Sequence, residues 1–203
     1  MSRLDPLSPD ILDPTTRAAY DQIVADSGPL PAPDREAIYG EATRKNRARI
    51  AGPFNIWLRC PGIAKPATDI ANYFHFRGRL SPRNTELVIL LAARHFGAPF
   101  AWATYEEYAR TAGLSDDAIA AIAAGRSVDD ESGMADDDRA VWKFTTTLLE
   151  NKRVDEDTYG ATVEVLGEGG TVELVSLIGF YAMIAFSLNA IEVAAPQGSA
   201  VPF

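Results

Sequence analysis

The stretch from Leu174 to Ile191 constrains the fold more than any other part of the sequence, because it carries no charged residue. It is long enough to form a helix and apolar enough to be buried. Glu173 and Glu192 flank it, whereas a membrane-spanning helix usually has basic and aromatic anchors at its ends. We therefore predict a buried helix in a protein that does not span a membrane.

The rest of the chain also shows helical patterns. No segment alternates apolar and polar residues as a strand does, and no Asn-Gly hairpin occurs. The sequence therefore predicts an all-α fold, in which the apolar run LVILLAA (87–93) makes its helix central and buried. The acidic segment 129–138 is predicted to be a solvated loop. Helices are expected over about 14–26, 34–50, a segment with Pro66 in its first turn that ends near Gly78, 82–96, 99–112, a short segment capped by Ser115, 137–151, 156–166 and 171–191.

A length of 203 residues suits one well-buried domain. The polar, proline-containing region 1–50 is predicted to be an N-terminal helical arm. The core domain is expected over 51–194, beginning at GPFNIWL. The remaining segment, 195–203, is predicted to be a tail that is frayed or bound to a partner.

Composition excludes several classes of function. The formal net charge of −9 argues against binding to nucleic acid, which needs a basic face. The opening segment MSRLDPLSPD has the character of neither a signal peptide nor a transit peptide, so a cytoplasmic location is expected. Cys60 is the only cysteine, and the histidines are His75 and His95 alone. This leaves no disulfide, no redox cysteine pair and few metal ligands, and we predict neither a metal nor a cofactor.

One combination of motifs resembles a known family. The segment 83–122 contains an R-x-x-E-L-x-I-L helix, an aromatic-rich second helix and the motif AGLSxxxIxAI, in that order. GPFNIWL before it and ELVSLIGFYxMIAFxLNAxEV after it extend the likeness over 51–194. These residues resemble the carboxymuconolactone decarboxylase family, which has the alkylhydroperoxidase D-like fold. The resemblance implies a cofactor-free, all-α protein that assembles as a homo-oligomer, whether dimer, trimer or hexamer.

The thiol chemistry of the family's peroxidase branch is excluded. That branch has a glutamate on the central helix, cysteines 12 and 15 residues later, and a histidine 19 residues later. Counted from Glu86, these positions are Ala98, Ala101 and Tyr105 here. Alanine supplies neither the thiolate nucleophile nor the resolving thiol. The lyase-like branch often has Glu-Trp-x-x-His on the second helix, of which this chain keeps only Trp102.

Tyr105 and Glu86 are the predicted catalytic residues. Tyr105 stands where the family's proton-handling histidine stands, and a phenol acts as a general acid or a hydrogen-bond donor. Spacings of four and seven residues place Ala101, Tyr105 and Tyr108 on one helical face. Glu86 lies in an apolar helix, where it would position a proton beside the substrate. The alternatives are that both tyrosines only pack in the core and that Glu86 forms a structural ion pair with Arg83.

The predicted substrate-binding residues are Arg83, Trp102, His75 and Asn55. Between residues 72 and 102 there are four arginines and one glutamate, which gives a local charge of 4 − 1 = +3 in a chain of net charge −9. This contrast favours a small anionic substrate, which Arg83 would hold, although salt bridges within an oligomer explain it equally well. Trp102 would wall the pocket or pack in the core, and His75 is equally compatible with a structural role. Asn55 would supply a pocket amide or cap a turn.

These observations predict a cofactor-free lyase or isomerase. The reaction would be decarboxylation or proton transfer on a small carboxylated cyclic or aromatic-derived metabolite, of the kind met in aromatic compound catabolism. Tyr105 would donate or relay the proton, Glu86 would tune it, and Arg83 would hold the anion. The alternative is a non-catalytic ligand-binding or structural oligomer whose active site has decayed.

Overall fold

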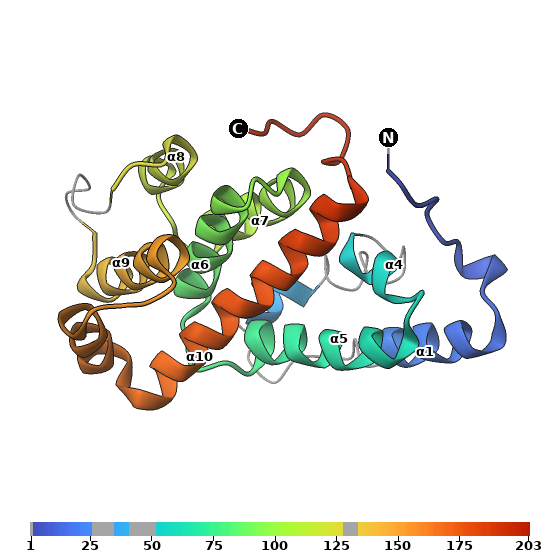
Figure 1. The fold of residues 1–203 in the computed structure, drawn as a ribbon, viewed down its shortest axis with the longest axis horizontal. Helices are drawn as coiled ribbons and strands as arrows, with labels where there is room; N and C mark the ends of the chain where they lie inside the picture. The colour runs from blue at the N-terminus through green and yellow to red at the C-terminus, as the bar shows by residue number, and fades with distance from the viewer. Residues whose placement is uncertain (1, 26–34, 41–51, 128–133) are drawn as a thin grey trace. The chain divides into compact units, whose positions relative to one another are not determined.

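The computed structural model describes residues 2–25, 35–40, 52–127 and 134–203, and the regular elements in these ranges are all helical (Figure 1). The prediction of an all-α fold is confirmed. The helix expected over 34–50 lies largely outside the described residues, and its described part forms one π-helical turn, η2 (Glu36–Gly40). Contacts divide the chain into a first unit of residues 1–78 and 190–193 and a second unit of residues 79–189 and 194–203. The domain boundaries predicted at residues 51 and 194 remain predictions.

The first unit is built on α5 (Pro61–Phe76), against which α1 (Pro14–Ala25) and α4 (Pro53–Trp57) pack. A single 3-10 turn, η1 (Pro9–Ile11), precedes α1. The carboxylate of Asp13 caps α1, accepting hydrogen bonds from the backbone N–H groups of Thr15 and Thr16 at 3.0 and 3.2 Å. The helix predicted to contain Pro66 in its first turn begins earlier, at Pro61, so that prediction is wrong and Pro66 lies inside α5.

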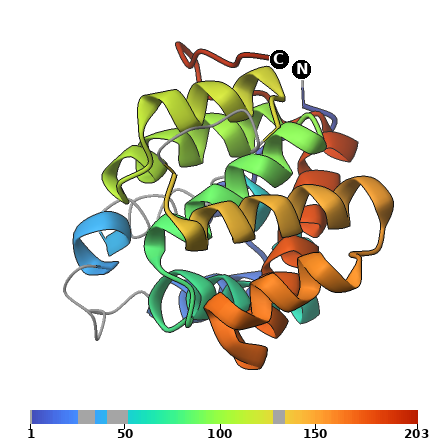
Figure 2. The same cartoon turned by 90° about the vertical axis from the view of Figure 1, so that its left-hand side faces the viewer.

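The second unit is centred on α6 (Pro82–His95), which packs against α7 (Pro99–Thr111), α8 (Asp116–Ala124) and α9 (Asp136–Asn151). Residues 84–93 of α6 are all buried, which confirms the predicted central helix. In Figure 2, α9 crosses the view between α8 above it and the first part of α10 below it. The hydroxyls of Ser81 and Ser115 cap α6 and α8, as predicted.

The last helix, α10 (Glu156–Ile191), joins the two helices predicted over 156–166 and 171–191. Gly167 interrupts it, with φ 69° and ψ 169°, a conformation that only glycine adopts readily. By length and composition α10 passes for a membrane span, as core helices of soluble proteins also do, and 44% of its most apolar window is buried. One face packs in the second unit, so the predicted burial applies to that face. The other face exposes an uncharged row of side chains, called the apolar stripe here: Val172, Val175, Gly179, Met183 and Phe186.

Candidate functional site

The predicted catalytic residues lie in a cluster of phenols around a buried carboxyl group. Glu86, on α6, is 0% exposed. On α7, the rings of Tyr105 and Tyr108 meet edge to face with centroids 5.7 Å apart, so the prediction that they share a helical face is confirmed. Tyr105 also meets Tyr181 of α10, at 5.4 Å. We call Glu86, Tyr105, Tyr108 and Tyr181 the phenol cluster.

Electrostatics link two members of the phenol cluster, Glu86 and Tyr108. Burial raises the pKa of Tyr108 to about 12, and the negative charge of Glu86 contributes to the same shift. Tyr105 and Tyr108 are half-buried, whereas Tyr181 is 2% exposed. A phenol with this raised pKa keeps its proton throughout the physiological pH range. Tyr108 is therefore able to donate a hydrogen bond, but it is a weaker acid than an ordinary tyrosine, and it gives up its proton only to a group more basic than its own phenolate, such as a carbanion.

Arg83 forms its ion pairs with α9 and not with Glu86. Its guanidinium binds Asp138 on α9, with Nη2 at 2.8 Å and Nε at 3.1 Å from the carboxylate oxygens, and Nη2 lies 3.7 Å from Asp137. Arg83 and Glu86 are three positions apart on α6, but the aspartates of α9 take the place of Glu86 as the ion-pair partners of Arg83, so the alternative of a structural Glu86–Arg83 pair is wrong. Arg83 is therefore held by two aspartates of the segment predicted to be a solvated loop.

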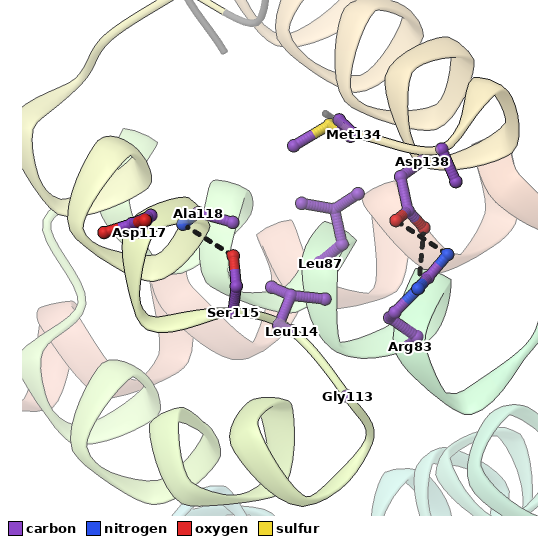
Figure 3. A pocket seen from close by; sticks show the side chains of 10 residues that line it. Arg83, Leu87, Gly113, Leu114, Ser115, Asp117, Ala118, Met134 and Asp138 are labelled. Carbon is purple, nitrogen blue, oxygen red and sulfur yellow. Dashed lines mark hydrogen bonds and ion pairs between the residues drawn. The ribbon is translucent and has the colours of Figure 1, made fainter. Parts of the chain in front are cut away.

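The Arg83–Asp138 pair forms one wall of a cavity of about 260 Å³ (Figure 3). Arg83 and Asp138 lie on one side, and Ser115 and Asp117 lie on the opposite side at the start of α8. Three apolar side chains line the cavity between these two sides: Leu87, Leu114 and Met134. The cavity is large enough for a small organic molecule, and its polar groups suit a ligand with an anionic end facing Arg83.

Asp138 is the electrostatically unusual carboxyl group of this cavity. Burial raises its pKa, an effect that the Arg83 guanidinium opposes and the neighbouring Asp137 reinforces. The Asp138 side chain is 10% exposed and that of Arg83 is 36% exposed. The positive charge of Arg83 is thus matched within the cavity wall, and an anionic ligand would compete with Asp138 for it.

Trp102 belongs neither to the phenol cluster nor to the lining of the 260 Å³ cavity. It is 1% exposed, and its indole Nε1–H donates to Glu106 at 3.0 Å. Its ring meets the ring of Phe203 edge to face, with centroids 5.4 Å apart. Trp102 lines a second cavity, of about 430 Å³, between α7, α8 and residues 200–202. The structure thus makes Trp102 a pocket wall, but of a cavity whose lining does not include Tyr105 or Glu86.

His75 and Asn55 belong to the first unit. The His75 ring is buried against Tyr39, at 4.8 Å between centroids, and near Phe76, at 6.0 Å. The Asn55 amide exchanges two hydrogen bonds with the backbone of Leu7, at 3.0 and 3.1 Å. Both contacts are the structural kind that the sequence analysis left open. Their predicted part in substrate binding remains untested.

His95 and Cys60, to which no role was assigned, are both exposed. Partial burial lowers the pKa of His95, and nearby Lys152 adds to this effect. Within the described parts of the chain, no group of three or more His, Cys, Asp or Glu residues is placed to hold a metal ion.

Sequence reasoning missed three residues of these sites: Tyr181, Asp138 and Phe203. Each comes from a segment distant in the chain from the residue it contacts, so no local spacing indicated the pairing. The nearest available signal was the acidic run at 136–138, which begins a helix whose first turn faces an arginine.

No protein-family model matches the sequence, and no curated protein is significantly similar to it. The resemblance to the carboxymuconolactone decarboxylase family therefore stays a prediction based on the motifs described above.

Proposed function

We propose that this protein is a cofactor-independent lyase or isomerase acting on a small carboxylated cyclic or aromatic-derived molecule. One feature carries the proposal: Glu86 is wholly buried, and its charge adds to the burial that raises the pKa of the half-buried Tyr108. A buried carboxyl group beside a phenol of raised pKa is a pattern more common at functional sites than in ordinary cores. The motif resemblance of residues 83–122 supports the same reaction class.

The chemistry follows from what the phenol cluster is able to donate. In a decarboxylation, the bond to the carboxylate carbon breaks, carbon dioxide leaves, and the electron pair remains as an enolate. The Tyr108 hydroxyl then gives its proton to the enolate carbon, and water returns a proton to the phenolate. An isomerisation uses the same donation after a proton has been lost elsewhere in the substrate. Glu86 disfavours the phenolate and so promotes its reprotonation, while Tyr105, between Tyr108 and Tyr181, orients the donor.

Arg83 is the proposed anion-binding residue. Its guanidinium forms the charged wall of the 260 Å³ cavity, and arginine binds carboxylates with paired hydrogen bonds. The lining of this cavity includes no residue of the phenol cluster, so the proposal requires the substrate to extend from Arg83 to the Tyr108 hydroxyl. Because Asp138 already occupies that guanidinium, a substrate carboxylate has to replace it. The burial that raises the pKa of Asp138 disfavours its charged form and so weakens its competition for the guanidinium.

Incubation with a panel of carboxylated lactones tests the proposal. Released carbon dioxide and the change in ultraviolet absorbance of the substrate are the measurements. We expect turnover by the native protein and none by the double variant Tyr105→Phe/Tyr108→Phe, which keeps both rings in place. Tyr159→Phe, which alters an exposed tyrosine of the same unit, is the matched control and should keep full activity. Undiminished turnover by the double variant would contradict the mechanism.

The apolar stripe of α10 favours a second function, that of a homo-oligomer. Val172 and Phe186 are 66% and 61% exposed, and the stripe carries no charge that would oppose its burial. The stripe includes Gly179, which would let a partner helix approach closely. Light scattering is expected to show a dimer, trimer or hexamer that Val172→Lys dissociates. A Tyr159→Lys control, outside the stripe, should leave the mass unchanged, and a monomeric native protein would exclude this assembly.

A further inference from the structure

Residues 194–203 are called the tail here, and the last four of them, 200–203, lie along a groove between α7 and α8 of the second unit. Ala200, Val201 and Pro202 face the apolar side chains Ile119, Ala120 and Ala123 across the 430 Å³ cavity. The tail ends in this groove at Phe203, whose ring lies between an indole and a guanidinium. Trp102 meets this ring edge to face at 5.4 Å, and Arg94 lies 5.1 Å from its centroid.

Both walls of the slot that holds Phe203 are fixed by contacts independent of the tail. Arg94 donates from Nε to the carbonyl oxygen of Ala123 at 2.8 Å, so α8 holds the guanidinium in place. Trp102 is held by Glu106, and Glu106 accepts from Arg110 at 2.6 Å. Arg110 in turn donates to Asp116 at 2.8 Å. The slot is therefore pre-organised to receive an aromatic ring, which lowers the entropy lost on binding.

The tail itself is held in a way that permits release. Among the described residues, no hydrogen bond joins it to the helices of the groove, and the described backbone bond within it closes the turn from Pro196 to Ser199 at 3.1 Å. Gly198 makes this turn with φ 86°. Side-chain contacts, chiefly those of Phe203, thus supply the binding energy. A segment held in this way exchanges readily between its own groove and an equivalent one.

We propose that the groove between α7 and α8 is a docking site for an extended apolar segment bearing an aromatic residue, and that its partner in trans is the tail of a second copy of this chain. The chain's own tail lies at the site when no exchange of tails between two copies has occurred. The inference concerns Trp102, Arg94 and Phe203, and it does not depend on the chemistry of the phenol cluster.

Two full-length variants test the docking site by complementation. Ala120→Glu, at an exposed position of α8, blocks the groove with a charge and releases the tail of its own chain. Phe203→Ala weakens the tail and leaves the groove open. We expect fluorescently labelled Ala120→Glu protein to bind Phe203→Ala protein saturably, as measured by anisotropy.

The matched control is the double variant Ala120→Glu/Phe203→Ala, in which the receiving groove is blocked as well. Because every protein in the experiment keeps the apolar stripe, association through that stripe contributes equally to both titrations. Binding to the Phe203→Ala protein is expected to be at least ~10-fold tighter than binding to the double variant. The blocked groove of the double variant cannot receive the incoming Phe203 ring, so the aromatic contact and the area it buries are lost. Equal binding to both proteins would overturn the proposal. Circular dichroism checks that the variants keep their helices.

Discussion

Two charged residues of α6, one helical turn apart, have opposite environments. Arg83 is 36% exposed and is neutralised by Asp138 within a cavity wall. Glu86 is 0% exposed, and its charge helps to raise the pKa of a phenol to about 12. The difference shows that a charged side chain on a buried helix has two uses. A matched pair shapes a binding wall, whereas a buried charge next to an ionisable group changes the behaviour of that group.

The largest expected effect separates the roles of these two regions by their kinetics. Tyr108→Phe removes the proposed donor and is expected to lower kcat by roughly 10²–10⁴-fold, the usual contribution of general acid catalysis. Arg83→Gln removes a charged hydrogen-bond donor and is expected to raise KM by about 10-fold while kcat changes little. Steady-state kinetics on a turned-over lactone acid measures both constants. A fall in kcat alone for Arg83→Gln would show that substrate binding and proton donation are not divided between Arg83 and Tyr108.

A smaller effect is expected on stability at the matched pair. Asp138→Ala leaves the Arg83 guanidinium without its principal acceptor and is expected to lower the free energy of unfolding by roughly 1–3 kcal/mol. Asp136→Ala is the control, because it removes an exposed aspartate from the same helical turn and should change stability by less than about 0.5 kcal/mol. Urea denaturation measures both values. Equal effects would mean that helix-end electrostatics, and not the Arg83 pair, accounts for the loss.

The smallest expected effect is a pH dependence of stability at the same pair. Because the pKa of Asp138 is raised in the folded protein, the folded state holds this proton more tightly than the unfolded state does. Its contribution to stability is complete below the ordinary carboxyl pKa and is lost as the pH rises through the folded value. The free energy of unfolding of the native protein, relative to Asp138→Asn, should therefore fall as the pH rises through the acid range. A difference that rises over this range would contradict the assigned direction.

The helices were largely predictable because their signals are local. Serine and aspartate caps, prolines near helix starts and the apolar run of α6 placed most elements within a few residues. Pro66 misled the prediction, since proline is favoured in a first turn but the preceding Pro61 already begins the helix. Gly167 was correctly expected to lie between two helical segments, although no local signal indicated that they form one interrupted helix.

The candidate site was predictable only in part. Spacing on one helix correctly put Tyr105 beside Tyr108, because a period of 3.6 residues fixes which side chains share a face. Spacing does not determine which helix faces a given residue, so the partners of Arg83 and Trp102 were missed. Asp138 and Phe203 reach them from distant segments by tertiary packing, which no short motif encodes.

The ionisation of Tyr108 tests the central claim most directly. Titration followed by the NMR signal of its ring, assigned by comparison with Tyr108→Phe, should give a pKa of about 12 in the native protein. In Glu86→Gln the pKa should fall but stay above 10.0, its ordinary value, because burial is the larger cause of the shift and remains. A Tyr108 pKa near its ordinary value in the native protein, or one that Glu86→Gln leaves unchanged, would contradict the account.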